Sequence, residues 1–239
     1  GKPLVLRLIN LKHNVFILEK KNTKRLKFLP KKPKKIITGD FTNKNLVAKI
    51  IKKNNIDVIF HTGAITQVLD SLKNPYETHL TNIMGTVNFL ENIRLINKKI
   101  IFIYSSSDKA YGELKNRKEY KEGDTLDSTY PYDVSKSSSD LICQSYSKTY
   151  SMKVGIIRCG NIYGPGDFNL KRLIPEVILS TIENKNFTIR SNGKSTRDYV
   201  YVEDAVSAYI KVFNKLKDSN DELKIYNVSS KFNYSVLAI

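Results

Sequence analysis

Residues 100–112 read IIFIYSSSDKAYG, an apolar run of strand length that passes directly into three serines and a charged pair. Unbroken apolarity is typical of a parallel strand that is buried on both faces. Similar short runs predict further strands at 15–18, 36–37, 58–60 and 154–157. The apolar spacing between these runs predicts helices at 43–54, 75–97 and 131–150. This alternation of strand and helix predicts a doubly wound α/β fold around a parallel sheet.

The composition limits the kind of protein this is. A chain of 239 residues with 41% hydrophobic side chains buries one substantial core and has room for a small second lobe. No apolar run reaches the roughly 18–20 residues of a membrane helix, and the first residues lack the form of a secretory signal. Cys143 and Cys159 form no CxxC pattern, and the three histidines lack metal-ligand spacing. We therefore expect a cytoplasmic protein with two reduced core cysteines, no membrane contact and no metal.

The positive charge is concentrated near the N-terminus. The formal net charge is +17, and residues 1–53 hold 16 Lys or Arg against Glu19 and Asp40 alone. The densest run, KKPKK at 31–35, has no interleaved aromatic side chains and matches no nucleic-acid-binding motif. We interpret it as a solvated basic face that attracts small anions, and we expect no nucleic-acid partner.

Two motifs carry chemistry. The serines after the strand at 100–104 lie at its carboxyl end, where open α/β sheets bind ligands. The second motif, YPYDVSK at 130–136, places Tyr132 and Lys136 on one face of a helix. A nearby ammonium favours the phenolate and lowers the tyrosine pKa from its ordinary value of about 10. Tyr132 can then take a proton from a substrate hydroxyl while Ser107 holds the substrate oxygen.

The order of these residues resembles the extended short-chain dehydrogenase/reductase family, which includes NAD-dependent nucleotide-sugar epimerases and dehydratases. The resemblance covers essentially the whole chain. It implies a Rossmann-type doubly wound parallel sheet with a small substrate-binding lobe, and a catalytic triad of Ser107, Tyr132 and Lys136. Residues 1–160 are expected to form the NAD-binding domain. Residues 161–239 are expected to form mainly the substrate-binding lobe, with segments that return to the sheet.

The chain departs from the family at its beginning. Relatives start with a strand and a GxxGxxG turn, and here Gly1 takes the place of the third glycine, with the following helix at 2–11. We therefore expect an N-terminally truncated domain whose sheet lacks its first strand, and a C-terminus that stops as a helix starts. The missing strand is expected to leave a gap with apolar edges at 15–18 and 58–60.

This registration also assigns residues to the cofactor. The resemblance implies that Glu19 binds the adenosine ribose, which favours NAD, although Lys20 and Lys21 leave NADP open. His61 is interpreted as a core histidine. The full set of residues that the resemblance places around NAD is Gly1, Glu19, Asp40, Phe41, Thr62, Gly63, Ala64, Asn82, Tyr132 and Lys136.

The residues after Ser107 bear on the reaction. The corresponding positions in 4-epimerases are commonly small or neutral, whereas Asp108 followed by Lys109 resembles the CDP-glucose type of 4,6-dehydratase. Such an enzyme needs a base for the C5 proton, here Lys109, and an acid for the departing C6 hydroxyl, here Asp108. Three alternatives stay open: a 4-epimerase of the UDP-glucose type, a fragment that cannot bind NAD, and a loop salt bridge between these two side chains.

The resemblance implies a nucleotide-diphosphate sugar as substrate. A guanidinium can bind a diphosphate with two parallel hydrogen bonds. The residues expected to contact the substrate are Asn161, Arg172, Arg190 and Arg197. A homodimer through the helices at 75–97 and 131–150 would follow the habit of the family.

Overall fold

The main sheet has four parallel strands in the order β3-β4-β5-β8. The structure is a computed structural model that describes residues 1–20, 29–113, 119–189 and 191–239. The strands are β3 (Val58–His61), β4 (Ile101–Ser107), β5 (Val154–Cys159) and β8 (Leu223–Val228). Every residue of β5 is buried, as expected for a parallel strand covered on both faces.

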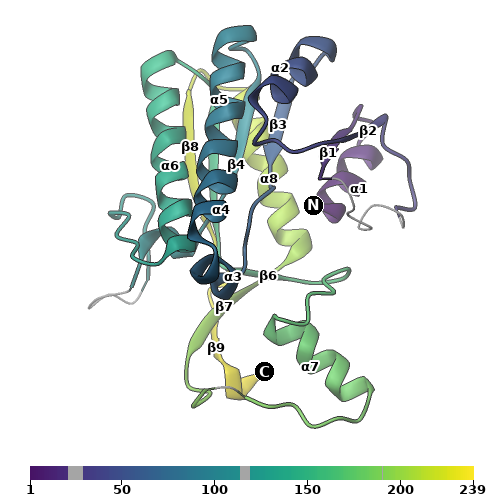
Figure 1. The fold of residues 1–239 in the computed structure, drawn as a ribbon, viewed down its shortest axis with the longest axis vertical. Helices are drawn as coiled ribbons and strands as arrows, with labels where there is room; N and C mark the ends of the chain where they lie inside the picture. Colours follow the sequence, from purple (N-terminus) through teal and green to yellow (C-terminus); the bar gives the residue numbers. More distant parts are fainter. Residues whose placement is uncertain (21–28, 114–118, 190) are drawn as a thin grey trace.

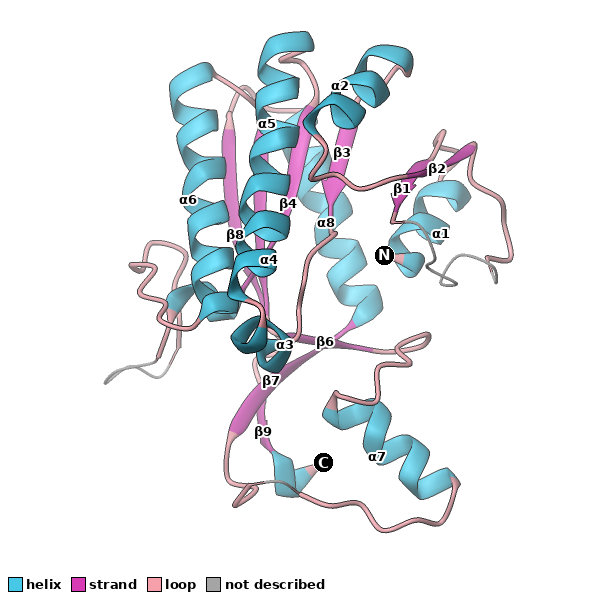
Figure 2. Cartoon of the chain, viewed as in Figure 1, coloured by secondary structure: helices cyan, strands magenta, loops and turns pink. Residues whose placement is uncertain are grey.

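Helices cover both faces of this sheet (Figure 2). On one face, α2 (Lys44–Lys53), α5 (Gly85–Ile96) and α6 (Pro131–Tyr150) enclose a core cluster that includes Leu90 and Phe102. On the other face, α8 (Val202–Lys217) and α1 (Lys2–Asn10) enclose a second cluster. The predicted doubly wound α/β fold is therefore confirmed.

The predicted gap in the sheet is present. β1 (Phe16–Glu19) pairs in parallel with β2 (Lys35–Thr38), and these two strands form a sheet of their own. Among the described strands none lies between β1 and β3, and residues 2–10 form a helix. Figure 1 shows the α1–β1–β2 unit set apart from the main sheet. The apolar side chains of β1 are only half-buried.

Two element boundaries differ from the prediction. β4 continues through Ser107, because Ser105, Ser106 and Ser107 pair with β5 even though their side chains are polar. The helix predicted at 75–97 consists of α4 (Pro75–His79), a π-helical turn η2 (Leu80–Met84) and α5, preceded by a short α3 (Val68–Lys73). Single π turns often mark functional sites.

The remaining elements form a smaller lobe below the main sheet in Figure 1. A three-stranded sheet consists of β6 (Asn161–Tyr163), β7 (Thr196–Tyr201) and β9 (Asn233–Ser235). The helix α7 (Leu173–Ile182) and a short turn η4 (Val236–Ala238) complete it. Between them, α8 and β8 return to the main sheet, where β8 pairs with β5.

Candidate active site at the carboxyl edge of the sheet

The end of β4 and the start of α6 bring the two predicted motifs together. A short 3-10 turn, η3 (Asp108–Tyr111), follows Ser107 directly and contacts α6. α6 begins after Tyr130 with Pro131 in its first turn, which suits a residue with fixed φ and no N–H to satisfy. Tyr132 and Lys136 therefore lie on the first two turns of a helix that packs against residues 107–111, which we call the serine turn.

Hydrogen bonds fix the serine turn. The Ser107 hydroxyl donates to Oδ1 of Asp108 at 2.9 Å and accepts from the backbone N–H of Lys109 at 3.2 Å. Burial raises the pKa of Asp108 above its ordinary value, although Lys109 and the Ser107 hydroxyl oppose the rise. A carboxyl group with a raised pKa keeps its proton longer as the pH rises, which suits a proton donor.

The predicted lowering of the Tyr132 pKa is wrong for this structure. Burial raises the pKa of Tyr132 to about 12, and the hydrogen bond with Ser107 opposes the rise only in part. The ammonium of Lys136 does not point at the phenol: it donates to the carbonyl oxygen of Ser105 at 2.7 Å and lies 5.1 Å from the centre of the Tyr104 ring. Burial lowers the pKa of Lys136 itself to about 8.

The residues predicted to contact the adenosine lie at the carboxyl ends of β1 and β2. Glu19 ends β1, and Asp40 and Phe41 follow β2. Lys20 pairs with Asp40 at 2.8 Å, so this cation already has a carboxylate partner. Gly1 precedes α1 and is exposed.

The loop after β3 is held by Asn82. Its side-chain amide accepts from Ile65 N at 2.8 Å and donates to the Ile65 carbonyl at 3.0 Å and to the Ser135 hydroxyl at 2.8 Å. Asn82 therefore ties the loop that contains Thr62, Gly63 and Ala64 to α6. Thr62 and Gly63 are exposed at this edge, and Ala64 is half-buried.

Phe41 packs against the glycines of this region. A Cβ added at Gly63 or Gly85 would lie 2.8 or 2.3 Å from the Phe41 ring, so the ring needs glycine at both positions. Its ring also meets His61 edge-on at 5.2 Å. His61 is a core histidine, as predicted: burial lowers its pKa to about 3.

The predicted substrate residues lie in the smaller lobe. Arg172 donates to Asp167 at 2.6 Å and to the Ile162 carbonyl at 2.7 Å, and its charge acts on Tyr132. Arg197 is exposed, and Asn161 bonds weakly to the Asp198 carbonyl at 3.5 Å. Arg190 lies outside the described residues.

Three buried charged residues near the site were not predicted. Asp133 is 8% exposed, and its Oδ1 has no hydrogen-bond partner among the described residues. Asp140 and Arg158 form an ion pair between α6 and β5. The spacing of Asp140 from Tyr132 and Lys136 on one helix face was the available signal, whereas its partner is distant in sequence.

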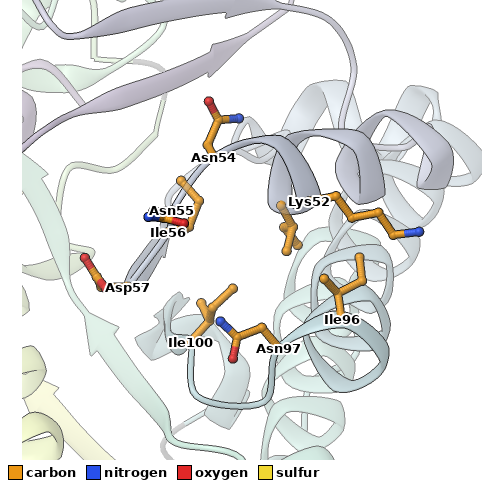
Figure 3. A pocket seen from close by; sticks show the side chains of 9 residues that line it. Lys52, Asn54, Asn55, Ile56, Asp57, Ile96, Asn97 and Ile100 are labelled. Carbon is orange, nitrogen blue, oxygen red and sulfur yellow. The ribbon is translucent and has the colours of Figure 1, made fainter.

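Other features lie away from this edge. A pocket of about 390 Å³ lies at the amino end of β3, lined by residues such as Asn55, Asp57 and Asn97 (Figure 3).

Cys143 and Cys159 are buried and free, in the core as predicted. Over the described ranges, no group of His, Cys, Asp or Glu is placed to hold a metal ion. Nor does any helix in this part of the chain have the length and apolarity to cross a membrane.

Comparison with known proteins identifies the family. The model of the NAD dependent epimerase/dehydratase family matches residues 1–229. The chain belongs to this family. Among its curated relatives, a dTDP-D-glucose 4,6-dehydratase of Dictyostelium discoideum is 33% identical over 215 residues, which cover 86% of this chain and 48% of that protein. This epimerase/dehydratase chain thus spans about half the length of that relative.

Solved structures of the family share the fold. A dTDP-glucose 4,6-dehydratase from Bacillus anthracis, in complex with NAD, is 26% identical with a TM-score of 0.85 and covers 99% of this chain and 74% of that one. A UDP-glucose 4-epimerase from Thermotoga maritima, with UDP-glucose, is 22% identical with a TM-score of 0.90 and covers 100% and 76%. The second likeness supports the Rossmann-type fold alone.

Proposed function

We propose that this protein acts as an NAD-dependent nucleotide-sugar 4,6-dehydratase. The observation that carries the proposal is the turn in which the half-buried Asp108 and Lys109 follow Ser107 beside Tyr132. A 4-epimerase needs one acid/base group for the C4 hydroxyl, whereas a dehydratase needs two more for C5 and C6. The raised pKa of Asp108 suits the acid that protonates the departing C6 hydroxyl. The dehydratase relatives support the same reaction class.

The cofactor proposed is NAD, held along the carboxyl edge. The carboxylate of Glu19 at the end of β1 is an acceptor suited to both ribose hydroxyls, and Lys20 is drawn to Asp40. Thr62, Gly63 and Ala64 are proposed to line the dinucleotide, with Asn82 holding their loop. When bound, NAD would accept the hydride from C4 of the sugar and, in its reduced form, return it to C6.

The chain's own residues supply the proton transfers. Tyr132 takes the proton of the C4 hydroxyl as its phenolate, and Ser107 holds the oxygen that becomes a carbonyl. This role requires the positive charge of bound NAD to lower the pKa of Tyr132 from the value of about 12 that burial gives it in the cofactor-free protein. The 4-keto group acidifies C5, so Lys109 removes the C5 proton while Asp108 donates a proton to the C6 hydroxyl. The C5–H and C6–O bonds break, a C5–C6 double bond forms, and water leaves. A proton later returns to C5 when the hydride reaches C6.

The smaller lobe is proposed to bind the nucleotide part of the substrate. Arg172 is held by Asp167 and the Ile162 carbonyl at the base of the lobe, where its charge acts on both Tyr132 and Tyr199. The charge of Arg197 also favours the ionised form of Tyr199. Two guanidinium groups near one tyrosine fit a diphosphate. Asn161 and Arg190 are proposed as further contacts, and CDP is the nucleotide that the Asp-Lys pair favours.

A homodimer is the proposed assembly. Leu95 of α5 and Leu141 of α6 are 59% and 53% exposed, on the two helices through which we expect the subunits to pair. Light scattering of the purified protein tests this assembly.

The experiment that tests the function uses the full-length protein with NAD in deuterated water. Given CDP-, dTDP- or UDP-glucose, it should release a 4-keto-6-deoxy sugar with solvent deuterium at C5. Lys109→Met should suppress the label at C5 and still permit C4 oxidation, seen as trapped NADH. A 4-epimer as sole product, with no label at C5, would replace the dehydratase proposal with the epimerase. Failure to bind NAD would support the inactive alternative.

A further inference from the structure

A buried ion pair joins α6 to β5 behind the candidate site. Asp140 and Arg158 are 0% and 3% exposed. Nε and Nη2 of Arg158 donate to Oδ2 and Oδ1 of Asp140 at 2.9 and 2.8 Å. A two-pronged contact of this kind fixes the relative orientation of its partners. Charges so deeply buried are costly unless further hydrogen bonds complete them, so the remaining contacts of the pair are informative.

The pair connects the two elements that present the triad. Asp140 lies one turn beyond Lys136 and two turns beyond Tyr132, and so continues the helix face that carries them. Arg158 lies opposite Ser106 in the β4–β5 register, one position before the pair formed by Ser107 and Cys159.

The remaining contacts hold the serine turn on both sides of Asp108 and Lys109. On the near side, the Ser106 hydroxyl donates to Oδ2 of Asp140 at 2.7 Å. On the far side, Nη1 of Arg158 donates to the Tyr111 hydroxyl at 2.7 Å, and the guanidinium lies 4.8 Å from the centre of that ring. One ion pair therefore tethers both ends of the turn.

Tyr111 is held in turn by the end of β8. Its hydroxyl donates to Oδ1 of Asn227 at 2.7 Å, and its ring stacks on Tyr120 at 4.6 Å. Nη1 of Arg158 also donates to the Glu122 carbonyl at 3.0 Å. Tyr111, on the far side of the turn, is thus fixed to β5 through Arg158 and to β8 through Asn227, two strands that are distant from it in sequence.

We propose that Asp140 and Arg158 are positioning residues that clamp the Asp108–Lys109 turn through Ser106 and Tyr111. This inference rests on the proposed roles of Asp108 and Lys109. A displacement of about 1 Å in a reacting group costs on the order of 100-fold in rate. Loosening the turn therefore lowers kcat. KM should change little, because the hydrogen bonds of the clamp run to Ser106, Tyr111 and the Glu122 carbonyl and not to Asn161, Arg172 or Arg197.

The test removes the tethers and keeps the ion pair. The double variant Ser106→Ala/Tyr111→Phe loses the two hydroxyls alone. Its kcat should fall about 10-fold or more while KM stays within about 2-fold. Gln144→Ala is the matched control, because Nε2 of Gln144 donates to Oδ1 of Asp140 at 2.8 Å from the side away from the turn. It should keep the kcat of the unmodified protein, and Ser106→Thr, which retains a hydroxyl, should keep most of it.

A second measurement needs no substrate. Amide hydrogen exchange of residues 107–112 should become about 10-fold faster in the double variant, with the core strands unchanged, and stay unchanged in Gln144→Ala. Unchanged exchange at 107–112 overturns the clamp, and so does faster exchange with unchanged kcat. An equal fall in stability for double variant and control, with kcat intact, assigns the pair to folding alone. If the unmodified protein turns over no nucleotide sugar, the proposed function fails and the exchange result still decides the clamp.

Discussion

The ammonium of Lys136 donates to the carbonyl oxygen of Ser105 at 2.7 Å, although Tyr132 lies one turn away on the same face of α6. The contact directs the lysine toward the end of β4 and leaves the phenol buried, where the charge of Arg172 and the hydrogen bond with Ser107 offset the effect of burial on its pKa only in part. In this arrangement Tyr132 holds its proton at neutral pH, because burial raises its pKa to about 12.

The ionisation of Tyr132 is the first prediction. In the cofactor-free protein, the ultraviolet difference titration between unmodified protein and Tyr132→Phe should show no phenolate from Tyr132 below about pH 10. Lys136→Met should leave this titration nearly unchanged, because the ammonium is bonded to Ser105. A phenolate that forms near neutral pH would contradict the structure.

Turnover of Tyr132→Phe is the second prediction. The phenol moves a proton in the transition state, so its loss should lower kcat by about 100-fold to 10,000-fold. Nucleotide-sugar affinity, measured by calorimetry, should stay within about 2-fold, since ground-state binding uses other groups. Near-normal turnover would remove Tyr132 from the proposed mechanism.

Asp108 should set the alkaline side of the pH profile. Its folded pKa lies above the ordinary 3.8, chiefly through burial, and the acid role needs the protonated form. Activity should therefore be retained below that raised pKa and fall as the pH rises through it. In Asp108→Asn, kcat should drop, and the fall of kcat with rising pH should disappear. If the fall of kcat with rising pH persists in Asp108→Asn, another titrating group causes it.

His61 should make the protein sensitive to mild acid. Its folded pKa of about 3 lies below the ordinary 6.5, so the unfolded chain binds a proton that the folded chain does not. Stability is fully present above pH 6.5 and should decline toward pH 3, by about 2 kcal/mol between pH 6.5 and 5. Urea unfolding should show a shallower pH dependence in His61→Phe. Replacement of the exposed His13 by Asn is the matched control for the loss of one imidazole.

Cofactor preference tests Glu19. A carboxylate at the end of β1 accepts hydrogen bonds from the ribose and repels a 2′-phosphate. The full-length protein should bind NAD more tightly than NADP, and Glu19→Ala should bring the two dissociation constants closer together. Lys20→Ala is the neighbouring control and should not narrow the difference. Equal affinity for both cofactors before mutation would refute the assignment.

Local pattern was enough to predict most elements but not the contacts between them. α6 begins and ends where its apolar spacing predicted, because helical period and Pro131 act within the helix. β4 extends past Tyr104 since pairing with β5, rather than side-chain apolarity, decides where that strand ends.

Within the site, the predicted arrangement follows from the fold class, whereas the contacts that were missed depend on individual side-chain directions. Ser107 and Tyr132 lie near each other because strand end and helix start are neighbours in any parallel sheet of this kind. The direction of Lys136 depends on the Ser105 carbonyl, and the ion pair of Asp140 joins residues 18 positions apart. Neither contact belongs to a periodic pattern that can be recognised in the sequence.

For residues 1–239 on their own, the separation of β1 from β3 argues against all-or-none melting. The unit formed by α1, β1 and β2 packs on α8 through α1 and on the main core through Leu18 and the neighbouring Phe41, without ladder hydrogen bonds between the two described sheets. Such a unit should lose its order before the main sheet does, as an early shoulder in calorimetry. A dinucleotide that touches both Glu19 and the loop after β3 would join the two halves thermodynamically, so its binding would merge the shoulder into a single, sharper transition.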